Sequence, residues 1–188
     1  MFSLRNLPNL LSLLRIALVP PVVFYLLQHH YMPALILFVV AGVTDSLDGW
    51  LAKRFNWQSA LGEILDPLAD KLLLVSSYIS FAWLELLPMW LVLSVILRDV
   101  IIVGGGLLYR FFFGAVVISP TYISKLNTLM QIVLIAVMLV SLAWLPVDDF
   151  IITALIWSVL FTTLASGIVY IFAWGGRAIY AAKNNSQV

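Results

Sequence analysis

The sequence contains no cysteine and little charge. Without cysteine, the chain can form neither a disulfide nor a thiolate-bound zinc or iron–sulfur centre. Only 10% of its 188 residues are charged, whereas 63% are hydrophobic and the mean hydropathy is +1.08. A chain of this composition has too few polar side chains to cover a water-exposed surface, so we expect an integral membrane protein.

Hydropathy predicts an all-α architecture in which a single membrane domain occupies residues 1–188. Six apolar segments have the length of about 20 residues that a helix needs to cross roughly 30 Å of hydrocarbon. We expect these six transmembrane helices at residues 8–28, 33–54, 58–84, 88–111, 122–145 and 149–173. Residues 2–7 have the pattern of a short amphipathic segment that lies on the membrane surface.

The basic residues predict how these spans are oriented. With the N-terminus inside, the inner connections receive the bases Arg5, Lys53, Arg54, Arg110, Lys125, Arg177 and Lys183. The outer connections, near residues 29–32, 85–88 and 146–149, contain no lysine or arginine. Because bases accumulate on the cytoplasmic side, we expect both termini and the active site to face the cytoplasm, at the inner membrane in a bacterium.

Four of the seven aspartates lie within 26 residues, at Asp45, Asp48, Asp66 and Asp70. The spacings of three and four within the two pairs put both carboxylates of a pair on one helix face. If the second and third spans form a hairpin turning near residues 55–57, Asp45 and Asp66 both lie roughly 15 Å from the turn. We therefore expect these two to face each other and the two pairs to converge.

Four negative charges inside a membrane need compensation. An aspartate at mid-span costs roughly 3 kcal/mol, so four together cost on the order of 10 kcal/mol. Two divalent cations would neutralise them, and an all-oxygen ligand set favours Mg²⁺, Mn²⁺ or Ca²⁺ over zinc. The alternatives are a structural polar network and the pathway of a metal-ion or proton transporter. Because Lys53, Arg54 and Lys71 stand beside the acids, we favour metal-dependent phosphotransfer, in which metals and bases share phosphate oxygens.

Small residues recur at helical intervals near the first aspartate pair, among them Gly42, Gly49 and Ala52. One interpretation is helix packing, since small residues let membrane helices approach closely. The other is that Gly49 and Ala52, with Gly62 from the next span, leave room for a flat ligand beside the metals.

The aspartates belong to a longer pattern that resembles the signature of the CDP-alcohol phosphatidyltransferases. It reads Asp45-x2-Asp48-Gly49-x2-Ala52-Lys53-x8-Gly62-x3-Asp66-x3-Asp70. The opening segment is also similar to the N-terminal segment of this family, with the sequence Asn6-Leu-Pro8-Asn9-Leu-Leu-Ser12-Leu-Leu-Arg15. One position departs from the pattern: Lys53 stands where the family usually has arginine, which keeps the charge but loses the bidentate fork.

The resemblance implies that an alcohol hydroxyl displaces CMP from CDP-diacylglycerol with the help of divalent metal, Mg²⁺ or Mn²⁺, two ions to a site. It implies the metal ligands Asp45, Asp48, Asp66 and Asp70, and Asp70 also as the general base. It places in the CDP pocket Gly49, Ala52, Lys53 and Gly62. Family members are commonly homodimers, a point that the residues themselves leave open.

Two missing bases bear on the acceptor. Phosphatidylglycerophosphate synthases of this family resemble one another in two motifs, Arg-Glu-x6-Arg and Lys-x-Lys-Thr. In this chain Gly106 replaces the last arginine of the first motif, and Asn127 replaces the second lysine of the other. A phosphomonoester acceptor would lose two charge-assisted contacts, each worth about 1.5–3 kcal/mol. The same segments, with residues 161–166, are more similar to CMP-forming cardiolipin synthases, whose acceptor is phosphatidylglycerol.

We therefore predict phosphatidylglycerol as the acceptor and cardiolipin as the product. Glycerol 3-phosphate is the alternative, which would make the chain a CDP-diacylglycerol–glycerol-3-phosphate 3-phosphatidyltransferase. We assign the acceptor phosphate to Arg98 and Lys125. The alternative for Arg98 is an internal ion pair with Asp99, and that for Lys125 is an anchor at the membrane interface.

Overall fold

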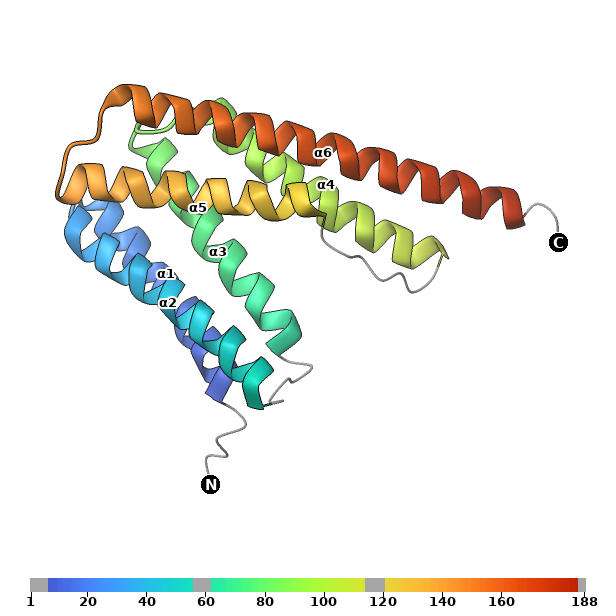
Figure 1. Cartoon of the computed structure of the whole chain (residues 1–188), viewed down its shortest axis with the longest axis horizontal. Helices are drawn as coiled ribbons and strands as arrows, with labels where there is room; N and C mark the ends of the chain where they lie inside the picture. The colour runs from blue at the N-terminus through green and yellow to red at the C-terminus, as the bar shows by residue number, and fades with distance from the viewer. Residues whose placement is uncertain (1–6, 56–61, 114–120, 186–188) are drawn as a thin grey trace. The chain divides into compact units, whose positions relative to one another are not determined.

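The computed structural model describes residues 7–55, 62–113 and 121–185, and all regular structure in these ranges is helical (Figure 1). The helices are α1 (Leu7–Leu27), α2 (Tyr31–Phe55), α3 (Gly62–Trp83), α4 (Met89–Phe113), α5 (Tyr122–Ala143) and α6 (Asp149–Asn185). Each predicted span coincides with one of them, although α6 continues well beyond residue 173. The predicted amphipathic segment lies outside the described residues except for Leu7, which begins α1.

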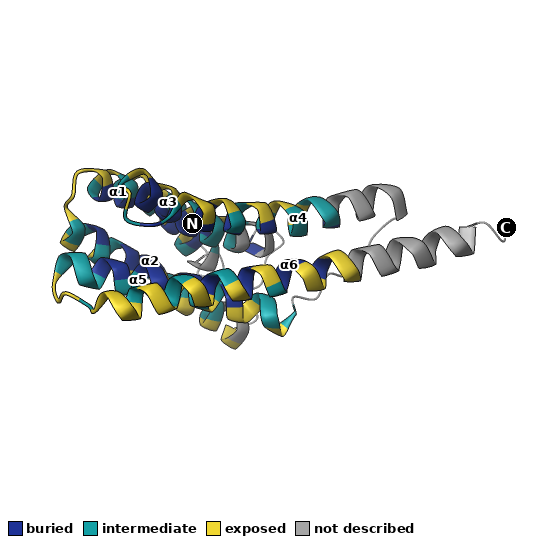
Figure 2. Ribbon diagram, turned by 90° about the horizontal axis from the view of Figure 1, so that it is seen from above, coloured by how far each residue is buried: buried dark blue, intermediate teal, exposed yellow. Residues whose placement is uncertain are grey.

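Five of the described helices are long and apolar enough to cross a membrane, in the segments Asn9–Leu27, Tyr31–Leu51, Met89–Gly106, Tyr122–Ala143 and Asp149–Phe172. The charges of α3 set it apart from these five, because four fall in its first ten residues: Glu63, Asp66, Asp70 and Lys71. Large apolar side chains such as Phe24, Phe161 and Phe172 are exposed on the helix surfaces (Figure 2). These features are those of a polytopic membrane protein, whose outer surface contacts lipid.

The chain divides into two compact units. The first comprises Met1–Leu87 and Ile135–Asp148, and the second comprises Pro88–Leu134 and Asp149–Val188. In the first unit α1 packs against both α2 and α3 (Figure 1). The buried side chains of this unit include Val22, Leu26, Phe38, Tyr78 and Phe81. In the second unit α4 packs against α6, and its buried side chains include Leu91, Val92, Val95 and Val159.

Two helices of the first unit end in the same kind of tight turn. His29 follows α1 and Glu85 follows α3, each with a φ of 58° in the left-handed region. In each turn the next N–H bonds back by five residues, from His30 to the Tyr25 carbonyl and from Leu86 to the Phe81 carbonyl, both at 2.9 Å. These bonds satisfy carbonyls at the helix ends and fix the point at which the chain leaves each helix.

Candidate active site

The four aspartates of the signature gather at two side chains of α1. Arg15 Nη1 donates to Asp70 Oδ1 at 2.5 Å and lies 2.8 Å from Asp45 Oδ1, while Nη2 donates to Asp48 Oδ2 at 2.5 Å. One helical turn earlier, the Ser12 hydroxyl donates to Asp66 Oδ1. The predicted convergence of the two aspartate pairs is therefore confirmed, with α1 as the element that joins them.

Ser12 and Arg15 are three residues apart, so they share the face of α1 that packs against α2 and α3. Both are buried, and Arg15 is only 1% exposed. A guanidinium this deep in an apolar helix is stable only with anionic partners, because an unpaired buried charge is strongly destabilising. The ion pairs between Arg15 and the carboxylates therefore hold α1 against α2 and α3.

The predicted register of the hairpin is wrong by about one turn. Asp45 shares Arg15 Nη1 with Asp70, while Asp66 lies at Ser12, so Asp45 is level with Asp70 and not with Asp66. The reason is the length of the connection, because α2 ends at Phe55 and α3 begins only at Gly62. The midpoint of the connection is thus shifted towards α3, and each residue of α2 faces a residue further along α3.

The carboxylates differ in their access to the surroundings. The side chains of Asp45 and Asp70 are 45% and 43% exposed, whereas that of Asp48 is 1% exposed. The cluster therefore has a buried wall, formed by Asp48 with Arg15, and an open side formed by Asp45 and Asp70. A hydrated ion or a phosphate can approach from the open side without separating the helices.

The composition of the cluster fits a divalent cation. Its four carboxylates, Asp45, Asp48, Asp66 and Asp70, offer only oxygen, the ligand that Mg²⁺ and Mn²⁺ prefer. Asp48 Oδ1 is buried and has no hydrogen-bond partner among the described residues, so one acceptor is left over for a cation. Over the same residues no three acidic or histidine side chains are grouped as a metal site, and three of the four carboxylates contact Arg15 instead.

The glycines of α2 bear on the two interpretations of the small residues. Among the described residues, a Cβ added to Gly42 or Gly49 meets nothing within 4 Å, so neither glycine is in a close contact with another described helix. This geometry disfavours the packing interpretation at Gly49 and is compatible with room for a ligand. Of the other predicted CDP residues, Gly62 is buried at the start of α3, while the side chains of Ala52 and Lys53 lie outside the described ones.

The open space at Gly49 leads to a first prediction. We expect Gly49→Ala to raise the free energy of unfolding by about 0.5–1 kcal/mol, because alanine favours the helix and meets no neighbour. We expect the same variant to bind CDP more weakly, because the added methyl enters the space assigned to the nucleotide. Gly42→Ala, two turns away on α2 and equally open, is the matched control. Destabilisation by Gly49→Ala with unchanged CDP affinity would support the packing interpretation.

The second unit contains a separate buried polar cluster around Arg98, which is 5% exposed. Its Nη1 donates to Asp99 Oδ1 at 2.7 Å, its Nη2 donates to Ser166 Oγ at 2.7 Å and to Ser124 Oγ, and its Nε donates to Ser166 Oγ at 3.2 Å. The internal pair with Asp99, the structural alternative for Arg98, is therefore present. Lys125 is exposed, with its Nζ 5.9 Å from the centre of the Tyr122 ring.

Asn127 is wholly buried in the second unit. Its Oδ1 accepts hydrogen bonds from the Thr162 and Thr163 hydroxyls, both at 2.9 Å, and its Nδ2 has no hydrogen-bond partner among the described residues. The amide that replaces an expected base is thus held by two threonines, in an environment built for a neutral side chain.

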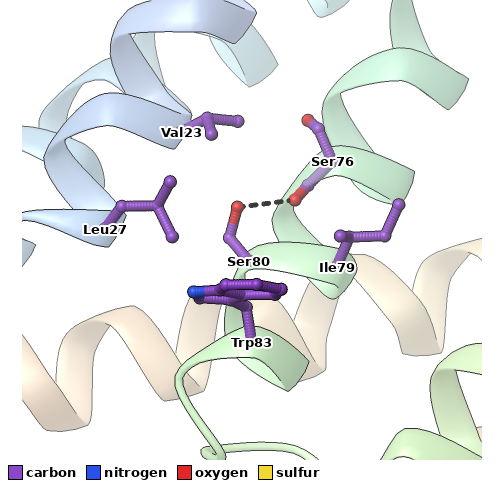
Figure 3. A pocket seen from close by; sticks show the side chains of 6 residues that line it. All are labelled: Val23, Leu27, Ser76, Ile79, Ser80 and Trp83. Atoms are coloured by element: carbon purple, nitrogen blue, oxygen red, sulfur yellow. Dashed lines mark hydrogen bonds between the residues drawn. The ribbon is translucent and has the colours of Figure 1, made fainter.

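An apolar pocket of about 320 Å³ lies between α1 and α3 (Figure 3), lined by Val23, Leu27, Ser76, Ile79, Ser80 and Trp83. Both serine hydroxyls are bonded to carbonyls of their own helix, Ser76 to Leu73 at 3.1 Å and Ser80 to Ser76 at 2.8 Å. Ser80 lies ten residues beyond Asp70, roughly 15 Å along α3. The pocket thus offers an apolar lining and stands apart from the carboxylates.

Arg15 is the residue of the cluster to which the sequence interpretation gave no role. Its signal was available, because a lone arginine inside an apolar span has to find an anionic partner, and the aspartates lie in the next two helices. Ser12 gave no comparable signal, since serine is common in membrane helices and its hydroxyl often bonds within its own helix.

Comparison with known proteins identifies the family and several relatives of this chain. The model of the CDP-alcohol phosphatidyltransferase family matches residues 5–171. The CMP-forming cardiolipin synthase of Rattus norvegicus is 34% identical over 194 residues, and that of Homo sapiens is 32% identical over 195 residues. Each alignment covers 95% of this chain but only 64% of the relative.

A second group of relatives is named for transfer to glycerol 3-phosphate. The CDP-diacylglycerol–glycerol-3-phosphate 3-phosphatidyltransferase of Bacillus subtilis is 30% identical over 185 residues, an alignment that covers 88% of this chain and 93% of the relative. Both groups of relatives and the family match point to one family. The chain belongs to the CDP-alcohol phosphatidyltransferases.

Proposed function

We propose that this chain transfers a phosphatidyl group from CDP-diacylglycerol to a hydroxyl of phosphatidylglycerol, which gives cardiolipin and releases CMP. The observation that carries the proposal is the meeting of Asp45, Asp48 and Asp70 at Arg15, with Asp66 at Ser12 next to them. The names of the rat and human relatives support the choice of product.

In this proposal Asp45, Asp48, Asp66 and Asp70 hold Mg²⁺ or Mn²⁺, two ions to a site. The bound metal would stabilise negative charge on the diphosphate and on the departing CMP. Asp70, on the open side of the cluster, takes the proton of the attacking hydroxyl. The hydroxyl oxygen forms a bond to the phosphorus that carries diacylglycerol, and the bond from that phosphorus to CMP breaks.

The protein groups that bind the two substrates are also part of the proposal. Gly49, Ala52, Lys53 and Gly62 line the CDP pocket, and the open space at Gly49 supports this assignment. Arg98 and Lys125 bind the acceptor phosphate. Because Arg98 is already bonded to Asp99 and two serines, it would have to exchange one hydroxyl partner for a phosphate oxygen.

The membrane arrangement is proposed from the charges. The helix α3 also crosses the membrane, which brings the number of spans to six. Its carboxylates are neutralised by Arg15 and by metal rather than exposed to lipid. With the bases of the inner connections on the cytoplasmic side, both termini and the carboxylate cluster face the cytoplasm. The protein forms a homodimer in this proposal, as the family resemblance implies, and mass measurement in nanodiscs distinguishes the dimer from a monomer.

The identity of the acceptor is tested by offering purified protein and CDP-diacylglycerol either phosphatidylglycerol or glycerol 3-phosphate. We expect cardiolipin and CMP with the first and little product with the second, because Asn127 replaces a base that would bind a phosphomonoester. The Bacillus subtilis relative makes glycerol 3-phosphate the second candidate. Formation of phosphatidylglycerophosphate without cardiolipin would select that candidate.

The enzyme class is tested against the transporter alternative by ligand stabilisation. At one hundred times its dissociation constant, CDP with Mn²⁺ is expected to stabilise the protein by about 2.7 kcal/mol, a rise of roughly 5–10 °C in Tm. Uridine diphosphate with Mn²⁺ is the control for unspecific diphosphate binding. A transporter would instead show Mn²⁺ or proton flux in proteoliposomes and no response to cytidine nucleotides.

A further inference from the structure

The ion pair between Arg15 and Asp48 leaves two polar atoms unused. Arg15 Nε and Asp48 Oδ1 are both buried and have no hydrogen-bond partner among the described residues. Their side chains are each 1% exposed and are joined by the 2.5 Å contact between Nη2 and Oδ2. A buried donor and a buried acceptor left unsatisfied within one ion pair are destabilising, and such groups in a native structure call for an explanation.

The unused atoms have opposite requirements. Asp48 Oδ1 needs a cation or a donor, and Arg15 Nε needs an acceptor such as a phosphate oxygen. A divalent cation bound together with a diphosphate supplies both at once. The pair is therefore satisfied by a metal–phosphate unit better than by either partner alone.

Charge balance leads to the same conclusion. Three carboxylates now share Arg15, so the guanidinium is the counter-ion of Asp45, Asp48 and Asp70. If two divalent cations neutralise the four aspartates, the positive charge of Arg15 has no remaining carboxylate to balance it. Because a buried unpaired charge is strongly destabilising, the guanidinium then requires another anion.

We infer that Arg15 is a phosphate-binding residue of this site: the carboxylates hold its guanidinium until a divalent cation takes them over, and it then binds the diphosphate of the donor. The inference rests on the proposed function, from which the identity of the diphosphate is taken. Its geometric basis is the three-way contact of Arg15 together with its unused Nε. The guanidinium suits this role because its planar fork matches phosphate oxygens.

Two of the three carboxylates that Arg15 contacts lie on the open side of the cluster. The partners that Arg15 releases include Asp45 and Asp70, which are about half exposed on the open side of the cluster. The long side chain can thus turn to an anion that arrives from that side while its backbone stays in α1. Release by Arg15 also removes a hydrogen bond from Asp70 Oδ1, on the carboxylate that we propose as proton acceptor.

The test compares Arg15→Gln and Arg15→Lys with the wild type in detergent micelles. The affinity for Mn²⁺ alone is measured from the electron paramagnetic resonance of free Mn²⁺. The affinity for CDP is then measured at saturating Mn²⁺. For Arg15→Gln we expect roughly tenfold tighter Mn²⁺ binding, because the competitor for the carboxylates is gone, and CDP binding weaker by about 10–100-fold, because a charge-assisted contact is lost. Arg15→Lys should change both in the same direction but less.

Arg177→Gln is the matched control, since Arg177 belongs to α6, which carries none of the residues assigned to the donor site, and its loss removes the same charge. We expect its affinities for Mn²⁺ and CDP to stay within about twofold of the wild type. Wild-type Mn²⁺ affinity in Arg15→Gln would show that Arg15 does not hold the carboxylates. Wild-type CDP affinity would show that Arg15 does not bind the diphosphate. If Arg15→Gln does not fold, unchanged affinities in Arg15→Lys overturn the inference.

The failure of this inference is distinguishable from that of the proposed function. A wild type that turns over CDP-diacylglycerol, together with an Arg15→Gln variant of unaltered affinities, overturns the inference alone. A wild type that releases no CMP and does not bind CDP overturns the proposed function. The Mn²⁺ measurement still decides in that case whether Arg15 and a cation compete for the carboxylates.

Discussion

Replacing Asp70 by asparagine is expected to reduce CMP release by roughly 10²–10⁴-fold, the usual contribution of a positioned general base. Asparagine has the same size as aspartate but takes up no proton at neutral pH. Its Oδ1 can still accept the hydrogen bond that Arg15 Nη1 donates to Asp70. We therefore expect the variant to stay folded, and to bind CDP at saturating Mn²⁺, while the chemical step fails.

The measurement is the initial rate of CMP release from CDP-diacylglycerol, accompanied by a thermal melt and a CDP titration. Asp149→Asn is the control, because Asp149 is an exposed carboxylate in the first turn of α6. It should keep the wild-type rate. A wild-type rate in Asp70→Asn would show that another group accepts the proton, and a variant that no longer binds CDP would make Asp70 chiefly a metal ligand.

The helices and the meeting of the four aspartates are predictable from the sequence alone. Spans are set by apolar length, and carboxylates at Asp45 and Asp48 share a helix face by periodicity, as do those at Asp66 and Asp70. The apolar length of a span and the periodicity along a helix are local properties of the chain. The register between the two pairs is less local, since it depends on where α3 begins after the connection, and the predicted level of Asp45 with Asp66 is wrong for this reason.

The partners of the buried arginines show the limit of such predictions. Arg15 reaches carboxylates 30 to 55 residues away, and Arg98 reaches Ser166, 68 residues away. The spacing of residues along one helix does not determine which face of another helix packs against it. Because a buried guanidinium requires anions, Asp45 or Asp70 could have been predicted as partners of Arg15. Ser124 and Ser166 carry no charge, so nothing in the sequence predicts them as partners of Arg98.

Replacing Arg98 by methionine is expected to lower the free energy of unfolding by about 3–5 kcal/mol, the usual loss when one member of a buried ion pair is removed. The side chain is 5% exposed and connects Asp99 in α4 with Ser124 in α5 and Ser166 in α6. Without it, Asp99, whose side chain is 13% exposed, loses its ion pair with Arg98. Reversible unfolding in mixed micelles measures the difference.

A second substitution separates the structural role of Arg98 from its proposed contact with the acceptor. In Arg98→Met/Asp99→Leu both charges are absent, so we expect most of the lost stability to return. If Arg98 also binds the acceptor phosphate, this stable variant will have a KM for phosphatidylglycerol raised about tenfold or more, with unchanged CDP affinity. Lys125→Gln, at an exposed position, should alter stability by less than about 0.5 kcal/mol. A double variant with wild-type KM would leave Arg98 as the buried counter-ion of Asp99 and transfer the acceptor phosphate to other residues.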